Sequence, residues 1–247
     1  MTKMKLKEKI FDNIKTVFGA LIIALLIRSF IFQPFYIPSS SMEPNLLIGD
    51  RIFVSKYTYG YSKHSLPFSP KVLSKRLFYK EPLQGDLVVF KTPADNRTDY
   101  IKRLIGLPGD EIQFVDGSIM INGNKVKRTE IKSNMSIRCG EFNIGVKSFE
   151  ETLPNGAKYI AVYNELGTLQ NTKKFIVPEN HFFLMGDNRD CSKDSRYLDS
   201  VGYVNYINLV GKAQIIFFSN DTISGSMFKI WNLKNSFRFN RTFKKIR

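Results

Sequence analysis

Three consecutive serines, Ser39–Ser41, and a lysine, Lys102, have the side chains that acyl-transfer chemistry needs. A serine hydroxyl is a poor nucleophile until a base takes its proton. The chain contains only two histidines, His64 and His181, which leaves little room for a Ser-His-Asp enzyme. Neither histidine has an evident role in catalysis. A lysine can be the base if burial lowers its pKa from the usual value of about 10.4. A hydrolase built from this chain would therefore find its base among lysines and carboxylates.

Cysteine and histidine are too scarce for the common metal sites. Two cysteines, Cys139 and Cys191, exclude a disulfide-dense scaffold and a four-cysteine zinc site. Two histidines argue against a histidine-rich site. The sequence therefore predicts neither a metal nor a cofactor.

Four segments combine the residue types that a peptidase would use: Ile37–Pro44, Gly85–Phe90, Tyr100–Asp110 and Gly186–Arg196. Each alone has an ordinary explanation. A serine run after an apolar segment is usually a solvated linker, and a Lys-Arg pair is usually surface charge. The Asp/Asn-rich loop resembles a turn or a calcium loop, although it lacks the EF-hand spacing.

Together and in this order, the segments resemble the motifs of bacterial type I signal peptidases. The motifs read Ser-Met-Glu-Pro, Gly-Asp, Tyr-Ile-Lys-Arg…Gly-Leu-Pro-Gly-Asp and Gly-Asp-Asn-Arg-Asp-x-Ser-x-Asp-Ser-Arg. The resemblance implies a membrane-anchored serine endopeptidase that removes signal peptides from exported preproteins through Ser/Lys acyl-enzyme chemistry. It further implies a cut after small residues at the first and third positions before the scissile bond.

The resemblance also assigns roles to individual residues. Ser41, directly before Met42, matches the nucleophile, and Lys102 matches the general base. Ser39 matches the side-chain donor of the oxyanion hole, which the N–H of Ser41 would complete. Ser192 matches the hydroxyl that orients the lysine. The residues that match structural acid-base pairs are Arg103, Asp187, Asp194 and Arg196.

Six apolar or aromatic residues match the family's substrate-binding positions: Phe35, Ile37, Met42, Leu46, Tyr100 and Ile101. They would form shallow pockets, with ordinary core packing as the alternative, which is equally favoured for Leu46. Two positions depart from the family pattern, because Ser40 replaces a common Gly and Cys191 a common Asn. Cys191 would be inert, reactive near the site, or paired with Cys139. The inert form is favoured over the reactive one, and the pairing stays open.

An apolar run from Val17 to Ile27, extended by Phe30–Phe32, predicts one transmembrane anchor over residues 16–33 that Pro34 ends. Five lysines precede it, whereas no Lys or Arg follows Arg28 until Arg51. The positive-inside rule then places residues 1–15 in the cytoplasm and 34–247 outside, on the periplasmic side of a bacterial inner membrane. A cleaved signal peptide lacks a suitable small-x-small site, and a buried core helix would not explain the lysines.

The body of the chain is expected to be mainly β: an antiparallel catalytic domain with a second, smaller β-lobe after the transmembrane helix. Short β-branched or aromatic runs predict strands at 86–90, 112–115, 119–121, 159–163, 182–185 and 213–218. Asp116-Gly117 and Asn122-Gly123 predict successive hairpin turns. Residues 124–180 are expected to be an inserted lobe.

The formal net charge of +15 is uneven, since residues 51–80 and 229–247 carry seven cationic side chains each. Interleaved aromatic residues in 51–80 suit an anionic membrane surface. Outside the cytoplasm no nucleic acid partner is expected, whereas preprotein signal peptides and the export machinery are.

Two other functions compete with signal-peptide removal. One is a related Ser/Lys protease that cuts itself, like the self-cleaving SOS repressors, but those are soluble and begin with a DNA-binding segment. The other is a basic β-domain that binds lipid or nucleic acid without catalysis, in which Ser41 and Lys102 would be dispensable.

Overall fold

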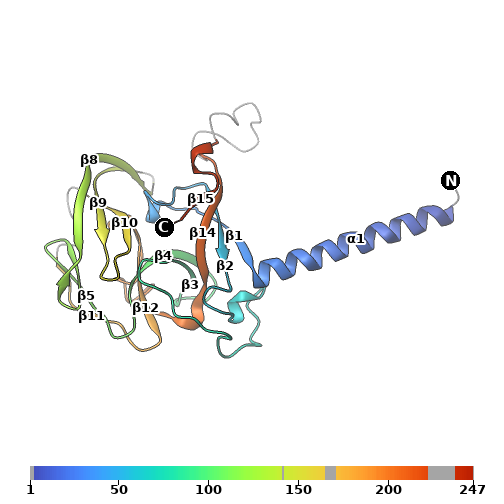
Figure 1. Cartoon of the computed structure of the whole chain (residues 1–247), viewed down its shortest axis with the longest axis horizontal. Coiled ribbons are helices and arrows are strands. Elements are labelled where there is room, and N and C mark those ends of the chain that lie inside the picture. The colour runs from blue at the N-terminus through green and yellow to red at the C-terminus, as the bar shows by residue number, and fades with distance from the viewer. Residues whose placement is uncertain (1–2, 141, 165–170, 222–236, 247) are drawn as a thin grey trace.

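A long N-terminal helix projects from a β-rich body in the computed structural model, which describes residues 3–140, 142–164, 171–221 and 237–246 (Figure 1). This helix, α1 (Lys3–Phe30), contains one stretch, Lys9–Phe30, that is long and apolar enough to cross a membrane. From Ile10 to Phe30 its large apolar side chains are exposed, which argues against a core helix.

The helix differs from the predicted segment at both ends. It begins before residue 16 and ends at Phe30, so Pro34 does not end it. Pro34 lies instead in β1 (Phe32–Tyr36), at the edge of the main sheet. An edge strand tolerates proline because one side of the strand needs no hydrogen-bond donors.

The main sheet has eight antiparallel strands in the order β1-β2-β14-β3-β4-β12-β13, with β15 paired to β14. After β1, its strands are β2 (Asp50–Ser55), β3 (Leu87–Lys91), β4 (Asp99–Gly106), β12 (His181–Met185), β13 (Val204–Asn205), β14 (Leu209–Ser219) and β15 (Lys244–Lys245). Strand β3 is central and apolar. Its Leu87 and Val89 pack into one hydrophobic cluster, and Val88 and Phe90 into another. The main-sheet strands predicted at 86–90, 182–185 and 213–218 are confirmed.

The smaller lobe lies between β4 and β12, on the side of the body away from α1 (Figure 1). One of its sheets contains β11 (Phe175–Ile176), β5 (Glu111–Val115), β6 (Ser118–Ile121) and β7 (Asn124–Lys125). The other contains β10 (Lys158–Asn164), β9 (Phe142–Thr152) and β8 (Lys127–Cys139). The lobe predicted from the sequence starts at residue 124. In the structure β5, which precedes that residue, pairs with β11 and so belongs to the lobe.

Two tight turns shape the first sheet of the lobe. Asp116-Gly117 and Asn122-Gly123 have positive φ angles at all four residues, as the predicted two-residue hairpin turns require. The lobe then packs on the main sheet through a shared core, in which Ile105 of β4 and Phe183 of β12 meet Phe114 of β5. The lobe is therefore joined to the two strands that border the site.

Short 3-10 helices connect the strands: η1 (Ser40–Met42), η2 (Lys63–Ser65), η3 (Tyr206–Asn208) and η5 (Phe239–Arg241). Part of the basic segment 229–247 lies outside the described residues.

Candidate active site

Ser41 lies in the single-turn helix η1, directly after β1. Ser39 precedes the turn in an extended conformation, and Met42, fully buried, fixes its far end. Asn188 holds the turn from the other side, because its N–H donates to the carbonyl of Ser41 and its side chain to that of Ser40, both at 3.2 Å. The serine is therefore positioned by two segments that are far apart in the sequence.

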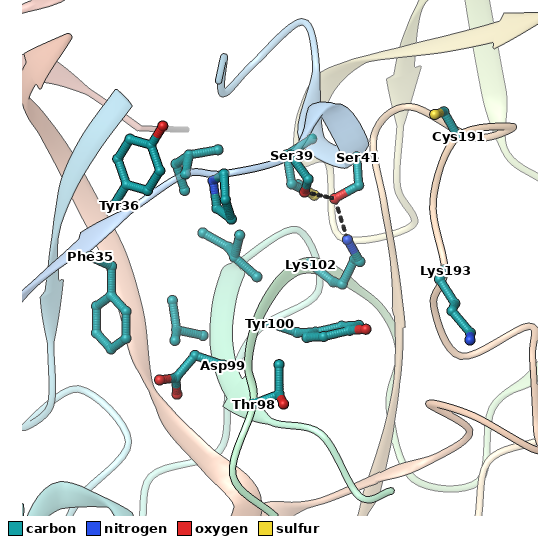
Figure 2. Close-up of a pocket in the computed structure, with 15 residues that line it drawn as sticks. Phe35, Tyr36, Ser39, Ser41, Thr98, Asp99, Tyr100, Lys102, Cys191 and Lys193 are labelled. Atoms are coloured by element: carbon teal, nitrogen blue, oxygen red, sulfur yellow. Dashed lines mark hydrogen bonds between the residues drawn. The ribbon is translucent and has the colours of Figure 1, made fainter. Parts of the chain in front are cut away.

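Lys102 reaches Ser41 from β4, between β3 and β12. Its Nζ lies 2.5 Å from Ser41 Oγ, and the side chain is only 4% exposed (Figure 2). Burial lowers the pKa of Lys102 from 10.5 to about 8, against the opposing effect of the carboxylates of Asp194 and Asp187. Burial disfavours an ammonium because the charge loses its hydration. A substantial fraction of Lys102 is thus neutral near physiological pH.

Two donors stand where charge would develop on a carbonyl oxygen. Ser39 Oγ lies 3.4 Å from Ser41 Oγ, and both residues line the same cleft (Figure 2). The N–H of Ser41 belongs to the first turn of η1, where backbone N–H groups have no acceptor within the helix. The arrangement offers one hydroxyl and one backbone donor beside Ser41 Oγ.

Two buried ion pairs border Lys102. Arg103 binds Asp187 through Nε and Nη2, each at 2.8 Å, and Arg196 binds Asp194 with the same two-point geometry and distances. Asp194 also accepts the N–H of Gly186 at 2.9 Å. The four predicted acid-base residues are therefore paired as Arg103 with Asp187 and Arg196 with Asp194.

Ser192 does not make the hydrogen bond to Lys102 that the resemblance implied. Among the residues that the structure describes, its buried hydroxyl has no hydrogen-bond partner. The side chain fills the space beside Gly186, where an added Cβ would lie 2.1 Å from Ser192 Oγ and 2.5 Å from the carbonyl oxygen of Ser41. Gly186 thus lets the catalytic loop approach η1 closely.

A third ion pair, which the sequence did not predict, joins this loop to the smaller lobe. Arg189 binds both carboxylate oxygens of Glu151, at 3.1 and 2.8 Å, and both side chains are almost fully buried. The hydroxyls of Tyr159 and Tyr163 donate to the same carboxylate. Arg189 stands inside a recognised motif, but Glu151 lies in a strand without any motif that would have indicated it.

A cleft of about 440 Å³ opens beside Ser41 and Lys102 (Figure 2). Five of the six predicted substrate-binding residues line it: Phe35, Ile37, Met42, Tyr100 and Ile101. Leu46 is fully buried in the core of the main sheet and does not line the cleft, so the alternative of core packing applies to it. The lining residues without a predicted substrate-contact role are Tyr36, Pro38, Val89, Thr98, Asp99, Cys191 and Lys193.

The two cysteines form a disulfide between the end of β8 and the loop after β12. Cys191 is therefore not a free thiol, and its sulfur lines the cleft 3.9 Å from the hydroxyl of Ser40. The two departures from the family pattern thus contact each other. Across the described ranges, no three His, Cys, Asp or Glu side chains gather as a metal site would require.

Comparison with known proteins identifies the family. Residues 10–218 match the family model described as signal peptidase, peptidase S26. The signal peptidase I of Rickettsia akari (strain Hartford) is 43% identical over 243 residues, which cover 91% of this chain and 88% of the relative. That of Rickettsia prowazekii (strain Madrid E) is 41% identical over 255 residues, covering 95% and 94%.

A solved signal peptidase I from Enterococcus faecalis V583 has 28% identity and a TM-score of 0.32, covering 54% of this chain and 97% of its own. The family model alone spans most of the chain. The chain belongs to the signal peptidase family, peptidase S26, whose members are serine proteases that remove signal peptides from preproteins.

Proposed function

We propose that Ser41 is the nucleophile and Lys102 the general base of a signal peptidase that works through an acyl-enzyme. One observation carries the proposal: the 2.5 Å contact between Lys102 Nζ and Ser41 Oγ in a buried position. A base must lie within hydrogen-bond reach of the proton it removes and must have a pKa near the working pH. The lowered pKa of Lys102, about 8, meets the second condition.

In acylation, the neutral amine of Lys102 takes the proton of Ser41 Oγ as that oxygen attacks the carbonyl carbon of the scissile bond. The resulting ammonium then gives its proton to the leaving nitrogen, which departs as the new N-terminus of the mature protein. In deacylation, the same amine takes a proton from water, whose oxygen attacks the ester, and returns the proton to Ser41. No other base is needed.

Ser39 and the N–H of Ser41 would stabilise the oxyanion that forms in both steps. Donors already aimed at the developing charge need no reorganisation during the reaction, and losing one costs about 10²–10³-fold in rate. Ser39 is suited to this task because its hydroxyl lies 3.4 Å from Ser41 Oγ and the residue lines the same cleft as Ser41 and Lys102.

The cleft favours substrates with small side chains at the first and third positions before the cut. Its apolar lining includes Ile37, Met42 and Ile101, together with the aromatic ring of Tyr100. An extended peptide places alternate side chains on one face, so the first and third would enter the same apolar wall. Replacing an alanine at the first position of a preprotein by phenylalanine should therefore block cleavage, whereas the same change at the second should not.

The helix α1 would anchor the enzyme in the bacterial inner membrane as a single span, with the N-terminus in the cytoplasm and the catalytic domain on the periplasmic side. The lysines before the span and the absence of cationic residues between Arg28 and Arg51 support this orientation. Protease added to spheroplasts should digest the β-domain and spare the N-terminal lysines; protection of residues 186–196 would contradict it.

The basic surface would hold the β-domain on anionic phospholipid, near preproteins that the export machinery delivers. Aromatic residues Tyr57, Phe68 and Phe78 are exposed beside its cationic side chains. A fragment from about Phe35 onward should bind anionic vesicles and release in high salt, because each Lys or Arg near such a surface contributes about 1 kcal/mol. Equal binding to neutral vesicles would contradict this attachment.

The nucleophile is tested by Ser41→Ala, with Ser40→Ala as the matched control. Ser40 is the neighbouring serine, and its hydroxyl faces Cys191 rather than Lys102. Ser41→Ala should abolish both preprotein cleavage and labelling by a serine-directed acylating reagent, and Ser40→Ala should retain both. Turnover above about 1% in Ser41→Ala would exclude Ser41, because loss of an attacking group costs far more than about 10²-fold.

A further inference from the structure

A second, smaller cavity lies where α1 meets the β-body. It measures about 130 Å³, and its lining includes Arg28 and Ser29 of the last turn of α1 together with Lys56, His64 and Lys91. The junction is held in place, because the N–H of Lys56 donates to the carbonyl of Ile31 at 3.1 Å and the hydroxyl of Tyr61 to that of Phe30 at 3.0 Å. This cavity, called the junction pocket below, is separate from the catalytic residues.

Positive charge dominates the junction pocket. Three cationic side chains line it, Arg28, Lys56 and Lys91, against one carboxylate, Asp99, which pairs with Lys91 at 2.8 Å. Lys56 is 2% exposed, and its ammonium donates to the carbonyls of Ser65 at 2.6 Å and His64 at 3.5 Å. An ammonium has three donors, so one remains for a further acceptor.

His64, which also lines the junction pocket, contributes a buried ring nitrogen without a hydrogen-bond partner among the described residues. Its Nδ1 lies 2.9 Å from the hydroxyl of Ser69, whereas Nε2 is buried and has no partner within the described part of the chain. Burial, and then the nearby charges of Lys63 and Lys91, lowers the pKa of His64 to about 4, so the ring is neutral at physiological pH. If the hydroxyl of Ser69 donates to Nδ1, the proton of the ring is on Nε2, where an acceptor is missing. Leaving such a donor buried and unpaired is costly.

The position of the junction pocket relative to the membrane indicates which kind of ligand it could bind. The apolar stretch of α1 ends at Phe30, and Arg28 and Ser29 belong to its last turn, so the pocket would lie at the level of the lipid headgroups. Phe68, which also lines the pocket, is fully exposed and has a positive φ of 61°. An aromatic side chain at this level suits the membrane interface.

We propose that the junction pocket binds the phosphate group of a membrane phospholipid, with Arg28 and Lys56 as charged donors and His64 Nε2–H as a neutral one. This inference rests on the proposed membrane attachment, but it adds a single defined site to a diffuse charged surface. A phosphate oxygen is the acceptor that suits all three groups, since phosphate is recognised by several N–H donors at once. The cavity has room for a few waters or one tetrahedral anion.

The occupant would lie next to the substrate cleft. Phe35 and Asp99 line both cavities, so one wall separates the phosphate site from the place where the preprotein binds. Both ligands would then contact the same wall from opposite sides, and the bound lipid would stabilise the shape of the cleft near Phe35.

The two histidines allow the site to be observed directly. His64 and His181 are the only histidines in the chain, and His181 does not line the junction pocket. The full-length protein is placed in phosphatidylcholine bicelles, and the ¹⁵N signals of both imidazoles are followed as phosphatidylglycerol is added. A parallel titration uses inorganic phosphate instead. The His64 signals should shift saturably with phosphatidylglycerol, and those of His181 should stay in place.

Variants then distinguish lipid binding at the junction pocket from general attraction of the lipid to the basic surface. Arg28→Gln and Lys56→Gln should each raise the half-saturating phosphatidylglycerol fraction at least about fivefold, the equivalent of roughly 1 kcal/mol per charge. Lys75→Gln, an equal charge change at an exposed site outside the pocket, should not. Arg28 is exposed, so its variant remains informative if the buried Lys56 variant does not fold.

Three outcomes would overturn the proposal: equal shifts of both histidines, a wild-type titration in Arg28→Gln, or a response to inorganic phosphate without one to phosphatidylglycerol. None of them would affect the Ser41 experiment. Binding of the fragment to anionic vesicles is measured separately and could persist with the junction pocket empty. A result that refutes lipid binding at the junction pocket can therefore be distinguished from one that refutes the proposed function.

Discussion

Two buried lysines in this protein have nearly the same acidity but different surroundings. Burial lowers the pKa of both Lys102 and Lys56 to about 8. Lys102 lies in the substrate cleft and contacts the hydroxyl of Ser41. Lys56 lies beneath the end of α1 and donates to the backbone carbonyls of His64 and Ser65.

This difference shows why a lowered pKa does not by itself identify a base. A carbonyl oxygen can only accept, so it holds the protonated form of Lys56 in place. The hydroxyl of Ser41 can donate its proton to a neutral amine, so Lys102 has a partner in either protonation state. We therefore expect Lys102 to act by losing its proton and Lys56 to act by keeping its charge.

Replacing each lysine with arginine is the strongest test of this comparison. A guanidinium does not lose its proton near neutral pH. Lys102→Arg should therefore lower kcat for preprotein cleavage by more than about 10³-fold, the scale of losses when a base and nucleophile act as a unit. Lys56→Arg should keep kcat within about threefold, because only its charge and its donors are required.

The control for both variants is folding, followed by the cooperative thermal unfolding of the purified protein. A folded Lys102→Arg enzyme that cleaves at the wild-type rate would mean that the base lies elsewhere. A folded Lys56→Arg enzyme with a loss as large as that of Lys102→Arg would remove the distinction between the two sites.

One hydroxyl from the lining of each cavity gives the next largest contrast. Ser39→Ala removes the proposed oxyanion donor and should lower kcat by about 10²-fold with little change in KM, because the lost interaction is made in the transition state. Ser69→Ala removes the hydroxyl beside His64 in the junction pocket and should leave both constants unchanged. A change confined to KM in Ser39→Ala would place Ser39 in substrate binding instead.

The pH dependence of cleavage provides a smaller and more specific test. Only neutral Lys102 can take the proton, and the folded-state pKa is about 8. The rate should therefore rise about tenfold per pH unit below that value and level off above it. Measured in Lys56→Arg, the profile should keep its midpoint, since Lys56 titrates without a catalytic role. A profile that follows Lys56 instead would reverse the assignment.

The sequence predicted the parts of this protein that local signals specify. Short β-branched or aromatic runs predicted strands β3, β5, β6, β10, β12 and β14, and Asp-Gly and Asn-Gly pairs predicted two turns. The motif order indicated Ser41 and Lys102, and the structure brings them into contact. Strand β5 pairs with β11, which is far from it in the sequence, and no local signal indicates such a pairing, so the predicted lobe did not include β5.

Features that depend on contacts between distant segments were beyond the sequence. Glu151 and Arg189 pair across two lobes, and no local pattern marks Glu151 as the partner. The pairing of Cys139 with Cys191 was one of several alternatives until the end of β8 was placed beside the catalytic loop. Ser192 was expected to hydrogen-bond to Lys102, but its hydroxyl lies beside Gly186 and has no hydrogen-bond partner among the described residues.

The smallest predicted effect concerns Asp99, which lines both cavities. Its carboxylate pairs with Lys91 at the partly exposed edge of the junction pocket, and such pairs contribute at most about 1 kcal/mol. Asp99→Asn would free Lys91 for the phosphate, so the half-saturating phosphatidylglycerol fraction in the His64 titration should fall by about two- to fivefold. The pH midpoint of cleavage should stay unchanged, because Asp99 is not among the charges that shift the pKa of Lys102. Weaker lipid binding in Asp99→Asn would mean that Asp99 organises the pocket instead of competing with its ligand. A shifted midpoint would show that the two lysine sites are electrostatically coupled.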